Sequence, residues 1–120
     1  MAKTSKTNSQ LQRVVHELRE LSREQDVAIW RDVAERLERS RKNWSEVNLS
    51  RVSRYATKGE KVLVPGVLLA TGELTVPVTV AAFRTSTAAR KKVEAAGGRT
   101  MSLLELAVAN PKGSGIKILG

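Results

Sequence analysis

Few residues of this chain have the chemistry of catalysis or metal binding, and their spacing keeps them apart. His16 is the only histidine, there is no cysteine, and the carboxylates are not clustered, so the ligands of a zinc site cannot be assembled. Glu17, Glu20 and Glu35 alternate with basic residues at helical spacing, which is typical of solvated charge rather than of a catalytic pair. The sequence therefore predicts no enzyme, no bound metal and no cofactor.

A glycine-rich segment near the C-terminus, from Pro111 to Gly115, is the one place that resembles a phosphate loop. Glycines let backbone amides approach phosphate oxygens. A nucleotide-binding loop also needs a Gly well before its Gly-Lys-Ser/Thr, and that pattern is missing here. We expect a tight turn in which Lys112 and Gly113 contact a backbone phosphate, and no small-molecule substrate.

The strongest signal in the composition is positive charge. The chain has 21 Lys and Arg against 12 Asp and Glu, a net charge of +9 and a pI near 10.5. Such a charge favours a polyanion as partner, either nucleic acid or an anionic membrane. No run approaches the roughly 18 apolar residues of a membrane span, and the polar start is unlike a secretory signal. We therefore expect nucleic acid, no membrane and, with no cysteine, a location compatible with the cytoplasm.

Much of the positive charge in the first 40 residues is balanced by nearby acids. Helical spacing pairs Glu35 with Arg31 and Arg39, and Asp32 with Arg36. Farther along, no acid compensates a stripe at i, i+3 and i+7. That stripe consists of Arg51, Arg54 and Lys58. Several separate basic groups of this kind suit a folded RNA that approaches from more than one side.

The elements that position these residues divide the chain into two parts. Residues 1–8 contain nothing to bury and are predicted to be a flexible basic tail. Apolar periodicity then predicts a helical region over 9–40, with one helix capped by Asn8 or Ser9 and a second capped by Asp26. Trp30 falls on the apolar stripe of the second helix and is expected in the core. Trp44 follows a basic segment and either packs on the helices or stacks on an unpaired base.

Residues 41–120 are predicted to form an α/β core that makes one domain with the helical region. A helix from Ser50 to Lys58 is expected to end at Gly59. The remaining elements are predicted as strands at 61–64 and 67–69 around a Pro65-Gly66 turn, a strand at 76–83, a helix capped by Ser86 or Thr87, a strand near 100–101, a helix at 102–109 and a strand at 116–119. The fold class is thus mixed α/β, with a helical N-terminal region followed by alternating short strands and helices.

Six stretches of the chain, in order, match a known family. They are Trp30 to Leu37, Glu46 to Val52, Val64-Pro65-Gly66 with Leu69 and Gly72, Val78 to Ala82, Ala95 to Gly98, and Asn110 to Gly113. In them the chain resembles the large-subunit ribosomal protein numbered eighteen in eukaryotes, in its short archaeal form, which is related to bacterial large-subunit protein fifteen. The family commonly has a Lys after the Pro-Gly pair, where this chain has Val67.

The resemblance implies a structural constituent of the large ribosomal subunit that binds large-subunit ribosomal RNA beside neighbouring ribosomal proteins. It also implies RNA contacts around residues 41–54. Together with the charge argument, the predicted RNA-binding residues are Lys3, Lys6, Arg41, Lys42, Asn48, Ser50, Arg51, Arg54, Lys58, Arg90, Lys91, Lys112 and Gly113. Two alternatives stay open: an ordinary basic surface, and a free-standing nucleic-acid-binding regulator that reads a duplex with residues 50–58.

Overall fold

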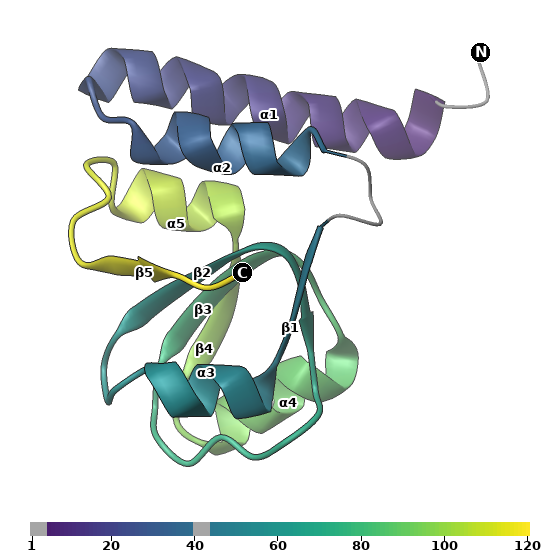
Figure 1. Cartoon of the computed structure of the whole chain (residues 1–120), viewed down its shortest axis with the longest axis vertical. Helices are drawn as coiled ribbons and strands as arrows, with labels where there is room; N and C mark the ends of the chain where they lie inside the picture. The colour runs from purple at the N-terminus through teal and green to yellow at the C-terminus, as the bar shows by residue number, and fades with distance from the viewer. Residues whose placement is uncertain (1–4, 40–43) are drawn as a thin grey trace.

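The computed structural model describes residues 5–39 and 44–120 (Figure 1). Its helices are α1 (Ser5–Gln25), α2 (Ile29–Leu37), α3 (Leu49–Tyr55), α4 (Thr87–Ala95) and α5 (Leu103–Ala109). Its strands are β1 (Ser45–Asn48), β2 (Lys61–Leu69), β3 (Thr79–Thr85), β4 (Arg99–Ser102) and β5 (Ile116–Ile118). Two N-terminal helices are followed by alternating strands and short helices, which confirms the mixed α/β class predicted from the sequence.

The strands form one sheet in which every pairing between described strands is parallel. β2 is central: it pairs with β1, β3 and β5, and β3 also pairs with β4. Parallel neighbours need a crossover connection rather than a hairpin. The short helix α3 makes the crossover from β1 to β2, and α4 makes the one from β3 to β4.

Helices cover both faces of the sheet (Figure 1). α1, α2 and α5 lie on one face and are called the α1–α2–α5 layer; α3 and α4 lie on the other and are called the α3–α4 layer. The side chains of β2 alternate between them, because Val62 and Val64 are buried with α3 and α4 while Leu63 is buried with α1, α2 and α5. A parallel sheet covered on both faces needs strands that are apolar throughout, which explains the run of aliphatic residues in β2.

β2 continues through Pro65 and Gly66, where the sequence predicted a turn, although its register against β3 shifts between Val64 and Val67. At this point β2 exchanges one neighbour for another, since residues 61–63 pair with β5 and residues 66–69 pair with β1. Pro65 has no N–H to donate, and it falls at this exchange. A Cβ on Gly66 would lie 2.2 Å from the carbonyl oxygen of Ser45, so the glycine lets β1 approach. The turn prediction was wrong because Pro and Gly are found both in turns and at the point where a strand changes its neighbouring strand.

α1 begins at Ser5, earlier than the Asn8 or Ser9 cap that the sequence predicted. Residues 5–8 add nothing to the apolar stripe, so periodicity gave no sign of them, but none is a Gly or Pro that would break a helix. Part of the predicted tail is therefore helical. Residues 1–4 and 40–43 lie outside the described residues.

Asp26 does not cap α2, as the sequence predicted. Its backbone φ is +54°, in the left-handed region that short polar residues tolerate better than most. α2 begins after Ala28, which makes no side-chain capping bond. Asp26 instead helps the chain reverse between α1 and α2 within residues 26–28, and its acidic side chain is exposed.

α3 ends at Tyr55, so it is shorter than the predicted helix. Lys58 and Gly59 lie in the following turn, in which the backbone N–H of Thr57 donates to the carboxylate of Glu60 at 2.8 Å. Gly59 has a φ of +81°, so it serves the turn and not the end of the helix. The prediction of a helix through Lys58 was therefore wrong, because the turn chemistry of residues 57–60 ends it earlier.

Local signals placed the last two helices correctly. The Ser86 hydroxyl accepts a hydrogen bond from the Ala89 N–H at the start of α4, which confirms one of the two predicted caps. Ser102 and Glu105 form a reciprocal capping box at the start of α5. β3 begins at Thr79 rather than at residue 76, so the segment containing Pro77 precedes the strand.

Candidate nucleic-acid interface

The two helical layers differ in net charge. α1, α2 and α5 together contain six basic and six acidic residues, so their charges cancel. α3 and α4 contain five basic residues and one acid, Glu94, which leaves +4 on two short helices. The uncompensated charge of the described helices therefore lies on one face of the sheet.

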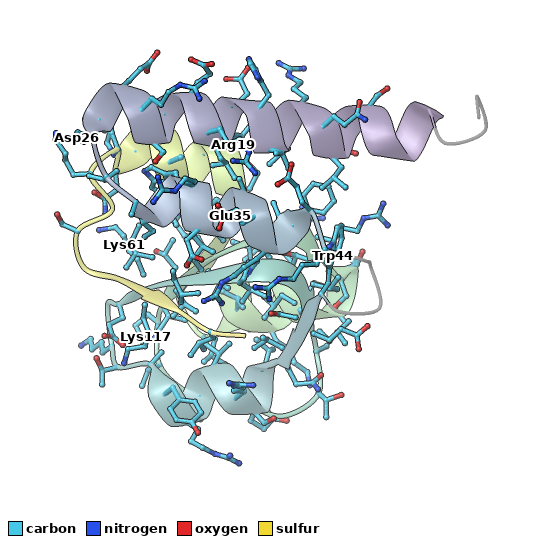
Figure 2. All side chains as sticks on the ribbon, turned by 45° about the horizontal axis from the view of Figure 1, so that its top comes forward. Arg19, Asp26, Glu35, Trp44, Lys61 and Lys117 are labelled. Atoms are coloured by element: carbon cyan, nitrogen blue, oxygen red, sulfur yellow. The ribbon has the colours of Figure 1, made fainter. Side chains whose placement is uncertain are left out.

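The α1–α2–α5 layer also joins its charges in ion pairs. These are Arg19 with Glu38, Arg23 with Glu20, and Arg36 with Asp32. Of the pairs predicted by helical spacing, only the last forms, at 3.5 Å. Arg31 and Arg39 make no ion pair with any described residue, although each stands four positions along the chain from Glu35, which is exposed (labelled in Figure 2). Neutrality here comes from the number of acids more than from the predicted pairs.

On α3, Arg51 and Arg54 are exposed, and neither makes an ion pair within the described parts of the chain. The guanidinium of Arg51 lies 5.8 Å from the ring centroid of Tyr55, a cation–π distance. Lys58 is exposed in the turn just beyond. Leu49 and Val52 are buried beneath, as predicted, so the helix presents its cations outward from the sheet.

The three consecutive basic residues of α4 have two different roles. The side chains of Arg90 and Lys91 are exposed and have no hydrogen-bond or ion-pair partner among the described residues. Lys92 is half-buried and donates to the carbonyl oxygens of Ala70 and Gly72, both at 3.0 Å. Lys92 therefore holds the loop after β2 against α4 and is not available as a free surface cation, whereas its two neighbours are.

Asn48 and Ser50 lie where α3 meets the loop after β2. The side-chain oxygen of Asn48 accepts from the N–H of Thr71 at 3.3 Å, and the N–H of Ser50 donates to the carbonyl of Thr71 at 3.0 Å. A Cβ on Gly72 would lie 2.5 Å from the Cβ of Ser50, so the loop packs directly on the start of the helix. These contacts give Asn48 and Ser50 a structural role that the sequence did not predict.

Lys112 and Gly113 lie away from the α3–α4 layer, beside the turn between α1 and α2. The ammonium group of Lys112 donates to the carbonyl oxygen of Gln25, the last residue of α1, at 3.2 Å. Gly113 has a φ of +72°, and a Cβ there would lie 2.6 Å from Cγ2 of Ile29. Lys112 and Gly113 thus make contacts within the protein that account for their residue types. The structure does not bring them together with Arg51 and Arg54.

Three predicted contact residues, Lys3, Arg41 and Lys42, lie outside the described residues, and Lys6 is described only as part of α1. Trp44 is buried, and its indole N–H donates to the carbonyls of Leu37 and Arg39. The core interpretation of Trp44 is confirmed. Trp30 is fully buried too, and its indole N–H donates to the Pro111 carbonyl at 2.7 Å.

Val67, where the resembled family commonly has a Lys, is half-buried and packs in the cluster beneath α1, α2 and α5. The side chain at this position therefore faces the layer opposite to Arg51 and Arg54. Its replacement of a lysine leaves the charge of the α3–α4 layer unchanged.

Sequence reasoning missed Tyr55, and it counted Lys117 as a surface cation without foreseeing its intramolecular contacts. Tyr55 is a large side chain that stays 48% exposed, and its position four residues after Arg51 was the available signal. Lys117 of β5 (Figure 2) donates to the Tyr55 carbonyl at 2.6 Å and lies 3.4 Å from the Glu60 carboxylate. The pKa of Glu60 lies below its ordinary value, chiefly because the Thr57 N–H donates to it and also because Lys117 is near.

Other kinds of site find no support in the part of the chain that the structure describes. No group of three or more His, Cys, Asp or Glu side chains there is arranged to hold a metal ion. None of the described helices is both long and apolar enough to cross a membrane. α3 is a crossover between two parallel strands rather than the reading helix of a helix-turn-helix, so the regulator alternative loses its structural basis.

The fold and this surface define a class: a small basic α/β protein in which the excess charge of the described helices lies on the α3–α4 layer. A family model described as "Ribosomal protein 60S L18 and 50S L18e" matches residues 1–120, and the chain belongs to this family of ribosomal proteins. The predicted resemblance is confirmed. The chain is accordingly a structural constituent of the large ribosomal subunit and not an enzyme.

Individual relatives agree over nearly the whole length. The chain is 45% identical to large ribosomal subunit protein eL18 of Methanospirillum hungatei over 117 residues, which cover 98% of this chain and 97% of the relative. It is 43% identical to the protein of the same name from Methanopyrus kandleri over 123 residues, covering 98% and 97%. The relative from Methanococcus maripaludis is 41% identical over 119 residues, covering 99% of each chain.

Proposed function

We propose that the chain binds folded large-subunit ribosomal RNA mainly through the α3–α4 layer. Arg51, Arg54 and Lys58 meet backbone phosphates at one end of this layer, and Arg90 and Lys91 meet them along α4. As a constituent of the large subunit, the chain also lies beside other ribosomal proteins. Its role is to neutralise crowded phosphates and hold the RNA fold, with no chemical step.

The observation that carries this proposal is the charge difference across the sheet. Two short helices hold +4, while the three helices on the other face sum to zero. The five cations named above make no hydrogen bond or ion pair with described residues, so they keep their full charge for a polyanion. Concentrating charge on one face raises the local potential far more than spreading the same charge would.

The remaining predicted contacts form smaller parts of the proposal. Asn48 and Ser50 border the α3 cations and place them, and the free amide hydrogens of Asn48 can reach RNA. Lys3, Lys6, Arg41 and Lys42 make a second contact from the N-terminal part of the chain. Lys112 and Gly113 make at most a third contact, since Lys112 already donates to Gln25.

The test is a salt titration of binding to deproteinised large-subunit ribosomal RNA, with transfer RNA as competitor. A triple variant, Arg51→Gln, Arg54→Gln and Lys58→Gln, should have a log-log salt slope shallower by about 2 to 3, because each phosphate contact contributes about 0.7 to 0.9. At 0.1 M salt its affinity should fall by about 10² to 10³, and the loss should shrink toward 1 M salt.

A second triple variant, Arg13→Gln, Arg31→Gln and Arg39→Gln, removes the same charge from the other side of the molecule. All three residues are exposed and unpaired within the described chain, so their loss should barely change the slope. Equal slopes for the two triple variants would overturn the α3–α4 layer as the interface. A slope near −1 for the wild-type chain would overturn RNA binding by phosphate neutralisation altogether.

A further inference from the structure

Tyr55 is an aromatic residue that the fold leaves at the surface. Among the described residues, the large hydrophobic side chains that remain exposed are Tyr55, at 48%, and Val108, at 78%. They lie on opposite layers, because Tyr55 ends α3 and Val108 belongs to α5. Tyr55 therefore stands on the layer with excess positive charge, and Val108 stands on the neutral one.

The surroundings of the Tyr55 ring are cationic. The Arg51 guanidinium lies 5.8 Å from the ring centroid, one helical turn away. α3 contains no acid, and Arg54 directly precedes the tyrosine. The Tyr55 hydroxyl has no hydrogen-bond partner among the described residues. A tyrosine hydroxyl usually has a partner once it is buried, so this one is available to a binding partner. A ring, a planar guanidinium and a free hydroxyl are thus presented together.

The backbone beneath the ring is held from several sides. The Tyr55 carbonyl, at the C-terminal end of α3, accepts from Lys117 of β5 at 2.6 Å. The next N–H, of Ala56, donates to Val52 at 2.9 Å, and that of Thr57 donates to Glu60. A contact group whose backbone is already fixed loses little further freedom on binding, which favours a specific contact over a loose one.

We infer that Tyr55 and Arg51 form a stacking platform for an unpaired base of large-subunit ribosomal RNA. The inference rests on the proposed function and adds a base contact to its phosphate contacts. Sequence-specific and structure-specific RNA recognition commonly targets splayed bases, which stack on aromatic rings and on guanidinium planes. The base stacks on the face of the ring that Arg51 does not cover, the Arg51 guanidinium lies over the other face, and the hydroxyl is free to donate to a ribose or phosphate oxygen.

A protein partner is the other way to cover an exposed tyrosine. The charge of this layer favours RNA, because a protein docking on the ring would have to accept several unpaired cations. The two occupants give different results with purified components. A base contact lowers affinity for RNA alone, whereas a protein contact shows only when the neighbouring proteins are present.

The experiment compares the wild-type chain with Tyr55→Leu and Tyr55→Phe in binding to deproteinised large-subunit ribosomal RNA. Leucine keeps an apolar side chain of moderate size but removes the ring. Tyr55→Leu should weaken binding by about 10- to 100-fold, in line with the loss of one base–aromatic stack. Its salt slope should equal that of the wild type, because no phosphate contact is removed. Tyr55→Phe should restore most of the affinity, and Val108→Ser should bind like the wild type.

Wild-type affinity for Tyr55→Leu would overturn the inference while leaving the phosphate contacts intact, since the charge variants would still change the salt slope. If Tyr55→Leu bound RNA with wild-type affinity but entered large subunits poorly, the Tyr55 ring would contact a protein partner and not an RNA base. Weak RNA binding by the wild-type chain, with a salt slope near −1, would instead mark failure of the proposed function.

A direct readout is ultraviolet cross-linking followed by trypsin digestion. Cleavage after Arg54 and Lys58 releases residues 55–58 as one tetrapeptide, which contains the only tyrosine of the chain. A nucleotide adduct on this tetrapeptide is the expected result. Adducts elsewhere on the chain but none on residues 55–58 would contradict a stacked base at this position.

Discussion

The α1–α2–α5 layer and the α3–α4 layer cover the same sheet but face different surroundings. The first is neutral, contains ion pairs within α1, within α2 and from α1 to Glu38 just after α2, and buries Trp30 and Leu18 completely. The second carries +4 on two short helices, with a half-exposed tyrosine among its cations. Both layers bury their inner faces against the sheet, so the difference lies in the outward residues.

The comparison teaches that basic residues must be judged by their partners and not by their number. The α1–α2–α5 layer has six basic residues, more than the five of the other layer, yet its net charge is zero. Even within the cationic layer, Lys92 is committed to the backbone while Lys91 beside it is free. Position in the sheet and hydrogen-bond partners separate the cations that hold the fold from those that are available to RNA.

The largest change in stability is expected on the neutral side, at Gly113. Its Cβ would lie 2.6 Å from Ile29 and its φ is +72°, so Gly113→Ala should lower the free energy of unfolding by about 2 to 4 kcal/mol. Gly115 has nearly the same φ but nothing within 4 Å of a Cβ, so Gly115→Ala should lower it by only about 1 to 2 kcal/mol. Denaturant unfolding measures both variants.

The RNA salt slope should be unchanged in both glycine variants, because no free cation is lost. Equal destabilisation by the two substitutions would mean that the packing of Gly113 on Ile29 does not matter. If Gly113→Ala alone changed the salt slope of RNA binding, the loop that contains Gly113 would belong to the RNA interface, and the contrast between the two layers would be weaker.

A smaller effect should separate the neighbouring lysines of α4. Lys92→Met leaves the carbonyls of Ala70 and Gly72 without their donor and should lower the free energy of unfolding by about 1 to 2 kcal/mol. Lys91→Met should leave stability unchanged but make the RNA salt slope shallower by about 1. If both variants changed the same property, the division of labour inside the cationic layer would be refuted.

The smallest effect concerns the pH dependence of the turn at Glu60. The folded-state pKa of Glu60 lies below its unfolded value, so its contribution to stability is present above the unfolded pKa, near 4.3, and is lost as the pH falls through the folded pKa. Glu60→Gln should therefore lose less stability than the wild type when unfolding is measured from pH 6 down to about pH 3. Parallel pH curves for the two proteins would contradict this assignment.

Sequence patterns predicted the elements that local chemistry specifies. Ser86 and Ser102 begin their helices as caps, and buried Leu49 and Val52 give α3 its inner face. The turn at Pro65-Gly66 was wrong because the exchange of β5 for β1 is set by strands distant in the sequence. The start of α1 was missed because apolar periodicity marks a stripe and not the end of a helix.

For the candidate site, the charge argument singled out Arg51 and Arg54, which the structure leaves exposed and unpaired within its described residues. It could not tell Lys91 from Lys92, because the carbonyls that Lys92 contacts come from a loop about 20 residues away. Nor could it foresee that Lys112 donates a hydrogen bond within the protein, because the acceptor is the carbonyl of Gln25 at the distant end of α1. Tyr55 was overlooked because exposure of an aromatic residue becomes visible only once the core is known.

The claim that RNA lies against the α3–α4 layer is tested most directly by tethered hydroxyl-radical cleavage. The chain has no cysteine, so single cysteines can carry an iron chelate at chosen positions. Thr57→Cys and Ala88→Cys place it on the α3–α4 layer, and Glu17→Cys and Glu35→Cys place it on the other; all four residues are exposed. In complexes with large-subunit ribosomal RNA, we predict strong, localised cuts from the first pair and weak cuts from the second. Stronger cleavage from Glu17→Cys and Glu35→Cys would contradict the assignment of the RNA-binding face.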